Sequence, residues 1–169
     1  VPRHQARGGL FVQWLQLYEM EPALVGSVLR AQLPHFEDVH AYLANQGDLL
    51  LVASPKGGVP SPGSRLFRDG ALRPDLARLG ILDVRDLQDG FVLDKRGLEA
   101  YAGLYSAPAN SDFFPYLQLR APVARFMNAS VDLATIQVLP WPLSRYLGNV
   151  PTRTSMQPLP AHRKPLRLD

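Results

Sequence analysis

The first third of the chain shows three patterns of hydrophobic and polar residues. A continuous apolar run at residues 10–14 predicts a buried strand. Apolar residues then recur at helical spacing over residues 22–33, and the proline that begins this stretch suits the first turn of a helix. Residues 36–43 alternate as in a strand, and residues 49–53, after the turn sequence NQGD, form a second buried run. We therefore predict a strand, a helix, a strand, a tight turn and a strand.

After residue 54 the pattern changes, because proline and glycine interrupt the chain. The sequence PKGGVPSPGS predicts a loop. Short helices are predicted at residues 74–79, 84–89 and 95–105, where apolar residues again fall at helical spacing. The stretch APANSDFFPYLQLRAP, residues 107–122, predicts irregular and then extended chain.

Composition limits the classes of protein that this chain can belong to. Its 169 residues suffice for one domain with a core. The net charge of +3, with its excess in the last residues, is too sparse to favour binding to nucleic acid. The absence of cysteine excludes disulfide frameworks, thiolate metal sites and cysteine nucleophiles. No apolar run approaches the roughly 20 residues needed to cross a bilayer, and the start, VPRHQARGG, lacks the apolar segment of a secretory leader.

Motifs for phosphate, metal or acid–base chemistry are weak. The sequence SPKGG follows a strand but lacks the spacing of a phosphate-binding loop. Asp83 precedes a predicted helix, which is typical of an N-cap. The histidines lack the spacing of metal ligands, and we interpret each as a surface or rim residue; they are His4, His35, His40 and His162.

The segment ANSDFFP leaves two interpretations open. Asn110 and Asp112 can form a turn that seats Phe113 and Phe114 in a core, because Asn and Asp side chains bond to the backbone nearby. The same segment can instead present the Asp112 carboxylate to a ligand. The residues alone favour the first interpretation without excluding the second.

Gln13 and Trp14 are the most specific candidate pair for a binding site. Residues at the carboxyl end of a parallel strand face the crevice in which open α/β sheets bind ligands. A Gln amide both donates and accepts hydrogen bonds, and a Trp ring can cover an aliphatic chain or a cation. The alternative is that Trp14 belongs to the core, as an aromatic residue beside a strand usually does.

Two stretches together resemble a known family. The segment GGLFVQWLQLYEMEPALVGSVLRAQLPHFEDVHAYLANQGDLLLVAS, residues 8–54, resembles the C-terminal half of the Rossmann-type domain of spermidine synthase-like proteins. The likeness is strongest to a bacterial subgroup in which this domain is attached to membrane-spanning segments. ANSDFFPYLQLRAP, residues 109–122, resembles a stretch common near the end of these proteins.

The resemblance implies a fold and a set of site residues. It implies the C-terminal half of a methyltransferase-like sheet, with about three mixed strands in the family order 5-7-6 and the last strand antiparallel. Gln13 matches the glutamine that spermidine synthases place beside the acceptor amine. Trp14 and Tyr18 match recurrent positions of the subgroup, and Asp112 matches the later motif, with no catalytic role attached to any of the three. We predict no catalytic residue and no metal ligand.

The resemblance also implies what would lie upstream of Val1. The glycine-rich loop for the nucleoside donor, the acidic residue for its ribose and the Asp-rich stretch that accepts the amine proton have no counterpart here. The parent family uses decarboxylated S-adenosylmethionine as donor, and we expect this chain alone to bind no cofactor. We divide the chain into residues 1–55 as the sheet part, residues 56–138 as a helical and irregular extension, and residues 139–169 as a proline-rich basic tail.

The leading hypothesis is therefore the C-terminal portion of an aminopropyltransferase of polyamine biosynthesis, inactive by itself. Its expected partner is the N-terminal half or another copy of itself, not nucleic acid. The resemblance places the parent protein on the cytoplasmic face of the inner membrane, attached through its membrane-spanning segments. The alternative hypothesis is a noncatalytic module that binds another domain or self-associates, since an open apolar strand edge invites pairing.

Overall fold

The computed structural model describes residues 6, 8–45 and 47–131. It is an α/β structure with a four-stranded sheet and five α-helices in this part of the chain. The predicted tail, residues 139–169, lies outside the described residues. The elements are β1 (Phe11–Gln16), α1 (Pro22–Gln32), the 3-10 helix η2 (Leu33–His35), β2 (Asp38–Leu43), β3 (Asp48–Ser54), the 3-10 helix η3 (Ser64–Arg68), α2 (Arg73–Arg78), α3 (Val84–Gln88), β4 (Phe91–Leu93), α4 (Lys95–Gly103) and α5 (Tyr116–Phe126).

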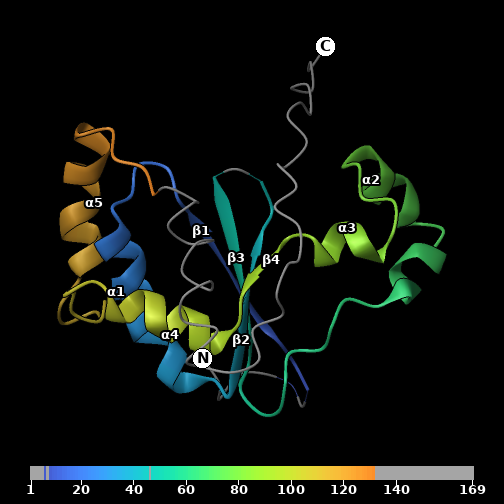
Figure 1. The fold of residues 1–169 in the computed structure, drawn as a ribbon, viewed down its shortest axis with the longest axis horizontal. Helices are drawn as coiled ribbons and strands as arrows, with labels where there is room; N and C mark the ends of the chain where they lie inside the picture. The colour runs from blue at the N-terminus through green and yellow to red at the C-terminus, as the bar shows by residue number, and fades with distance from the viewer. Residues whose placement is uncertain (1–5, 7, 46, 132–169) are drawn as a thin grey trace.

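The sheet has the strand order β1-β3-β2-β4, and every neighbouring pair is antiparallel. β1 and β2 therefore run in the same direction with β3 between them, and α1 is the connection that joins them (Figure 1). The predicted order of the first three strands is the observed one. The predicted antiparallel direction of the third strand is confirmed, whereas the number and the term mixed are corrected: every neighbouring pair is antiparallel, and β4 adds a fourth strand. β4 has only three residues, too few for alternation to reveal it, and it exists through its pairing with β2.

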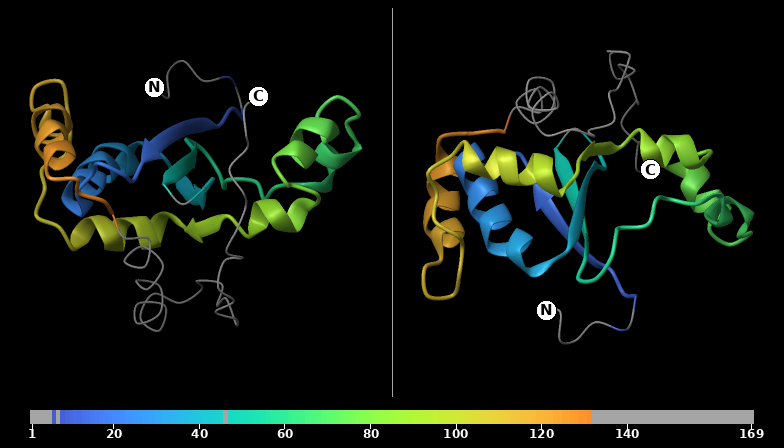
Figure 2. Two further views of the ribbon diagram at one scale, coloured as in Figure 1. Left: turned by 90° about the horizontal axis from the view of Figure 1, so that it is seen from above. Right: turned by 60° about the horizontal axis from the view of Figure 1, so that its bottom comes forward.

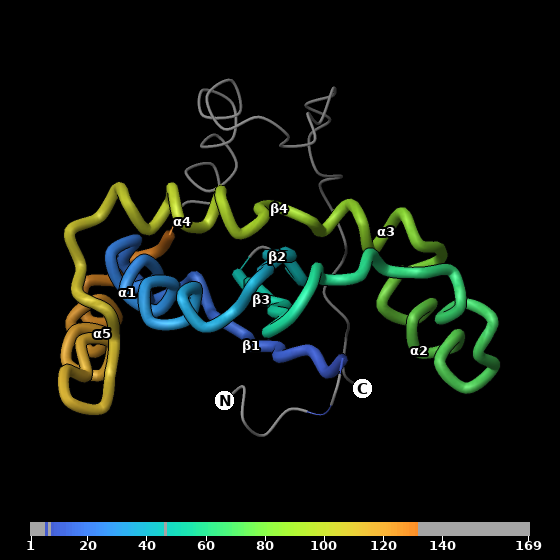
Figure 3. The backbone as a smooth tube through the Cα atoms, turned by 90° about the horizontal axis from the view of Figure 1, so that it is seen from below, coloured from blue at the N-terminus to red at the C-terminus, as the bar shows by residue number. Residues whose placement is uncertain are grey.

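One face of the sheet, the covered face, carries the core. Figure 3 shows α1 beside the sheet and α5 on the far side of α1. α4 packs against α1 and completes the layer. The burial of a Leu or Val side chain contributes about 1.5–3 kcal/mol, so this layer holds most of the folding energy. Its buried side chains include Leu15, Val39, Ala41, Leu49, Leu51 and Ala53 from the strands, Leu24, Val25, Val28 and Leu29 from α1, and Leu98 and Tyr101 from α4.

The opposite face of the sheet, the outer face, is aromatic and partly exposed. Val12 and Trp14 of β1 are 56% and 53% exposed, so the prediction of a buried first strand is wrong. The run alternates between the two faces instead, as a strand at the edge of a sheet does. The outer face consists of Val12, Trp14 and Gln16 from β1, Asp48, Leu50 and Val52 from β3, Asp38, His40 and Tyr42 from β2, and Phe91 from β4.

A lobe formed by η3, α2 and α3 lies at the end of the molecule opposite α5 (Figure 2). None of these three elements has a buried residue. The predicted helices at residues 74–79 and 84–89 are confirmed within one residue. The predicted N-cap is confirmed as well: the Asp83 carboxylate accepts the backbone N–H of Arg85 at 2.6 Å, and Asp86 completes a capping box.

Helix α5 corrects the prediction that residues 107–122 end in extended chain. Pro122 suggested a break, since proline cannot donate a helical hydrogen bond. The helix forms nevertheless, because Asn110 Oδ1 accepts the Leu117 N–H at 2.9 Å and Ala124 is fully buried. The interpretation that Phe113 and Phe114 sit in a core is wrong: Phe113 is fully exposed and Phe114 is 51% exposed.

Candidate functional site

The predicted pair Gln13 and Trp14 is divided between the two faces of the sheet. Gln13 lies on the covered face, where its side-chain oxygen accepts a hydrogen bond from Gln32 at the end of α1. Trp14 lies on the outer face, opposite Leu50 of β3. The strand also continues past both residues to Gln16. Gln13 is therefore a mid-strand residue held by a helix, and the two side chains do not line one site.

Four residues lie at or just beyond the carboxyl end of β1, and we name them the carboxyl-edge cluster: Trp14, Gln16 and Asp48 on the outer face, and Tyr18, whose ring lies beside Gly47. Gln16 is paired with Asp48 across the strands. The turn between β2 and β3 lies beside them, because the Leu17 N–H donates to the carbonyl of Gly47 at 2.7 Å. Open α/β sheets bind ligands at the carboxyl ends of their parallel strands; here β1 and β2 end at this edge, whereas the antiparallel β3 begins at it.

Two features give the carboxyl-edge cluster its shape. A Cβ atom on Gly47 would lie 3.1 Å from Cδ1 of Tyr18, so the absence of a side chain there lets the Tyr18 ring rest against the turn. The Asp48 carboxylate accepts a hydrogen bond from Asn45 through Oδ2, whereas its buried Oδ1 has no partner among the described residues. A carboxylate oxygen can accept a hydrogen bond from a donor group such as an amine, but Oδ1 of Asp48 is covered by the protein's own atoms in this structure.

Asp112, the fourth predicted site residue, is distant in sequence from the carboxyl-edge cluster and has different neighbours. It is exposed in the loop that leads into α5. This loop is fixed by its neighbours, because the Ser111 hydroxyl accepts the Phe114 N–H at 3.0 Å and the Asn110 N–H donates to the carbonyl of Ser27 at 3.2 Å. Asn110 therefore has a structural role in joining α1 to α5.

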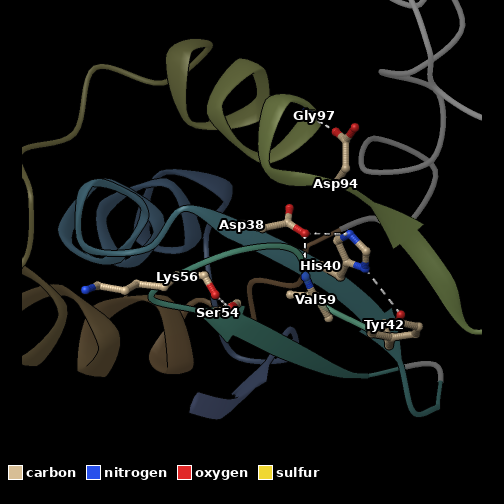
Figure 4. A network of polar contacts seen from close by, with 8 residues as sticks. All are labelled: Asp38, His40, Tyr42, Ser54, Lys56, Val59, Asp94 and Gly97. Carbon is tan, nitrogen blue, oxygen red and sulfur yellow. Dashed lines mark hydrogen bonds and ion pairs between the residues drawn. The ribbon is translucent and has the colours of Figure 1, made fainter. Parts of the chain in front are cut away.

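A second polar group, a row of three side chains, follows β2 on the outer face. Figure 4 shows Asp38, His40 and Tyr42 on the same side of this strand. His40 Nε2 lies 3.3 Å from Asp38 Oδ2, and His40 Nδ1 lies 3.5 Å from the Tyr42 hydroxyl. Phe91 stacks edge-on against both rings. Burial, and then the charge of Asp38, raise the pKa of Tyr42, so its hydroxyl stays protonated. Each ring nitrogen of His40 thus lies beside a polar neighbour, and the tautomer of the ring decides which group donates to which.

The glycine-rich loop after β3 is filled by carboxylates of the protein itself. The Gly57 N–H donates to Glu37 Oε2 at 2.6 Å, and the Val59 N–H donates to Asp38 Oδ2 at 2.7 Å. Backbone N–H groups of such loops bind anions when they are free. Here they bind Glu37 and Asp38, in agreement with the sequence argument against a phosphate site.

An open groove of about 610 Å³ lies between the end of α1 and the end of α4. Its cation, Arg30, donates through Nη2 to the carbonyls of Ala102 and Tyr105 at 2.8 and 2.9 Å. A cation at this position satisfies the last carbonyls of a helix. None of Gln13, Trp14, Tyr18 or Asp112 lines the groove, and its other walls are mainly alanine, proline and leucine.

Apart from the groups described above, the described residues offer few groups suited to metal binding or catalysis. In the described ranges no three His, Cys, Asp or Glu side chains are grouped as metal ligands, and no helix there has the length and hydropathy to cross a membrane. Tyr101 is buried in the core, where burial, followed by the neighbouring Tyr105, raises the pKa of its hydroxyl. No protein-family model, no curated protein and no solved structure matches this chain.

Sequence analysis missed two members of the carboxyl-edge cluster, Gln16 and Asp48. The sequence carried a signal for Gln16. Strict alternation over FVQWLQ assigns Gln16 to the same face as Trp14. Asp48 could be found only through the antiparallel register that pairs it with Gln16.

Proposed function

We propose that this chain is the C-terminal part of a spermidine synthase-like aminopropyltransferase domain and is inactive alone. The observation that carries the proposal is the strand order β1-β3-β2, in which the third strand along the chain is inserted between two strands that run in the same direction. The sequence motifs imply this order, 5-7-6, for the C-terminal half of such a domain. In the complete domain β1 would be an interior strand.

The exposed edge of the sheet supports this proposal. Leu10, Val12 and Trp14 are 40–56% exposed in and before β1, and the far edge of β1 has no strand against it among the described residues. An apolar edge strand without a neighbour is a site for pairing with a further strand. A preceding half domain would supply that strand and cover these side chains.

The proposed reaction transfers an aminopropyl group from decarboxylated S-adenosylmethionine to a diamine. A neutral amine attacks the carbon next to the sulfonium, a C–N bond forms, and the electron pair of the broken C–S bond neutralises the sulfur. The amine then loses a proton. The part of the protein in this step is to orient the amine and to accept its proton. The donor pocket and the proton acceptor would belong to the upstream half.

Within this chain, the carboxyl-edge cluster is the better candidate for contact with the acceptor amine. Gln16 offers an amide oxygen at the carboxyl end of β1, next to the exposed Trp14 ring, and Asp48 is its partner across the strands. The oxygen of Gln13, which the family resemblance favours, already accepts a bond from Gln32. The two glutamines therefore give a matched test of the site.

The first experiment measures binding of the donor to the isolated chain. Calorimetry with decarboxylated S-adenosylmethionine should give no heat of binding. A second experiment uses the longer protein that contains this chain, with release of methylthioadenosine as the readout. Gln16→Ala should raise the KM for the diamine, whereas Gln13→Ala should change KM less. Tight binding of the donor to the chain alone, or no transferase activity of the longer protein, would overturn the proposal.

A second candidate function is a noncatalytic interaction module. The observation that favours it is the same apolar edge, since β1 can add to the sheet of any partner that offers a strand. It predicts a longer protein without transferase activity that still loses its partner when Val12 is replaced by a charged residue.

A further inference from the structure

Helix α5 exposes an apolar stripe that the proposed function does not use. Leu119, Pro122, Val123 and Phe126 follow the spacing i, i+3, i+4, i+7, and residues with this spacing lie on one side of a helix. That side points away from α1, because the residues at the intervening positions pack inward. Leu119 is 63% exposed and Phe126 is 90% exposed.

The stripe continues at both ends of the helix. Phe114 stacks on Tyr116 with ring centroids 6.3 Å apart, and Phe113 beside it is fully exposed. At the other end Met127 is 68% exposed next to Phe126. Monomeric proteins rarely expose a contiguous apolar patch of this kind without a partner.

The composition of the stripe is that of a protein interface. Residues 113–127, FFPYLQLRAPVARFM, contain aromatic residues, methionine and arginine but no lysine, aspartate or glutamate. Aromatic residues, Met and Arg are enriched at protein interfaces, and Lys, Asp and Glu are depleted. A membrane-surface helix needs a polar face opposite its apolar face, whereas the inner side of α5 packs its apolar residues against the core. The exposed carboxylate of Asp112, directly beside Phe113, also opposes entry into lipid.

The stripe is complementary to itself when it is reversed. Phe113 and Phe114 form its first end, Phe126 and Met127 form its last end, and the middle is aliphatic. An antiparallel second copy would set each aromatic end against the Phe–Met end of the other. It would also bring Asp112 of one copy towards the end that carries Arg125, which pairs with Glu19 of its own chain at 3.4 Å, and it would oppose the two helix dipoles. A surface that contacts itself about a twofold axis has these properties.

We propose that α5 is an interface between two copies of this chain, which pair their α5 helices in antiparallel fashion about a twofold axis near Leu119. The contact is separate from the edge of β1, since α5 lies beyond α1 from the sheet (Figure 3). It does not depend on the proposed transferase function. Each copy keeps its β1 edge available to another strand.

The first test is sedimentation of the full chain as a function of its concentration. The wild-type chain should form dimers, and Leu119→Glu and Phe126→Glu should each raise the dissociation constant by at least about tenfold, which corresponds to about 1.4 kcal/mol. The matched control is Leu82→Glu in the lobe, where the leucine is 71% exposed and the substitution should leave dimerisation unchanged. A monomer at all concentrations, or an equal effect of the control, would overturn the proposal.

The second test uses the absence of cysteine in the native chain. Under oxidation, Leu119→Cys should cross-link to its own copy, because it lies near the axis. Phe113→Cys and Phe126→Cys should cross-link with each other when mixed and much less with themselves. Equal self-cross-linking of Phe113→Cys would indicate a parallel pair and contradict the proposed arrangement.

Two further experiments distinguish this interface from association through the strand edge and from binding to a membrane. Val12→Glu on β1 should leave the dimer intact. If Val12→Glu abolishes the dimer and Leu119→Glu does not, the two copies associate through the strand edge instead. Vesicles of anionic lipid should not bind the chain. Binding to such vesicles that Phe126→Glu abolishes, with the chain monomeric in solution, would assign the stripe to a membrane and overturn the proposal.

Discussion

Helices α1 and α5 are each eleven residues long and pack side by side, but they use their apolar residues in opposite ways. α1 buries six consecutive residues, from Leu24 to Leu29, between the sheet and the other helices. α5 buries only Ala124 and turns its larger apolar residues to solvent. Two helices of equal length and similar composition therefore differ in the role of their apolar residues. α1 holds the fold together, and the apolar side of α5 faces solvent.

The largest expected difference between the two helices comes from one substitution made in each. Leu29→Ala in α1 removes a leucine that is 1% exposed and should lower the free energy of unfolding by about 2–5 kcal/mol. Leu119→Ala in α5 should change it by no more than about 0.5 kcal/mol, as exposed substitutions do. Urea denaturation followed by circular dichroism, at a concentration where the chain is monomeric, measures both. Similar losses in the two variants would mean that α5 is as much a part of the core as α1.

The sequence predicted α1 and missed α5 for physical reasons. α1 has an inward apolar stripe and a proline in its first turn, two signals that agree. α5 contains Pro122 in its interior, which locally argues against a helix. What holds α5 is tertiary: the hydrogen bond from Leu117 to Asn110 and the packing of Ala124 against α1. No local pattern reports such contacts.

In the sheet and in the candidate site, too, some features could be predicted from the sequence, whereas others depend on contacts between elements. The strand order could be predicted, because the sequence resembles a family whose sheet has that order. The exposure of Trp14 could not, since an apolar run of five residues looks alike in an interior strand and at an edge. The sequence pattern and the family resemblance both point to Gln13, and the pattern does so because it predicts that the strand ends near residue 13. The pairing with β3 extends it to Gln16 and moves the carboxyl edge by three residues.

A smaller effect should come from the link between the two helices. Ser27 of α1 is fully buried, and its hydroxyl donates to the carbonyl of Pro108, just before α5, at 2.6 Å. Ser27→Ala should lower the free energy of unfolding by about 0.5–1.5 kcal/mol, the net contribution of one such hydrogen bond. Ser61→Ala, at an exposed loop position, is the control and should have no measurable effect.

Hydrogen exchange sharpens this prediction. Amide exchange in α5 should become faster in Ser27→Ala, while exchange in α4, which packs on α1 through other residues, should change little. Uniform acceleration in both helices would indicate general loss of stability rather than a loosened contact between α1 and α5.

The smallest expected effect concerns Pro122 itself. Proline in a helix interior is unfavourable relative to alanine, because it lacks the N–H that would bond to the carbonyl four residues earlier. Pro122→Ala restores that donor towards Gln118, but it also gives the unfolded chain more freedom, which opposes the gain. We expect a net increase in stability of less than about 1 kcal/mol, visible as a small rise in Tm. A clear decrease in Tm would instead mean that the bend made by Pro122 is needed to fit α5 onto α1. In that case the exposure of the apolar stripe would follow from how α5 must pack, and the difference between the two helices would be one of geometry as well as of burial.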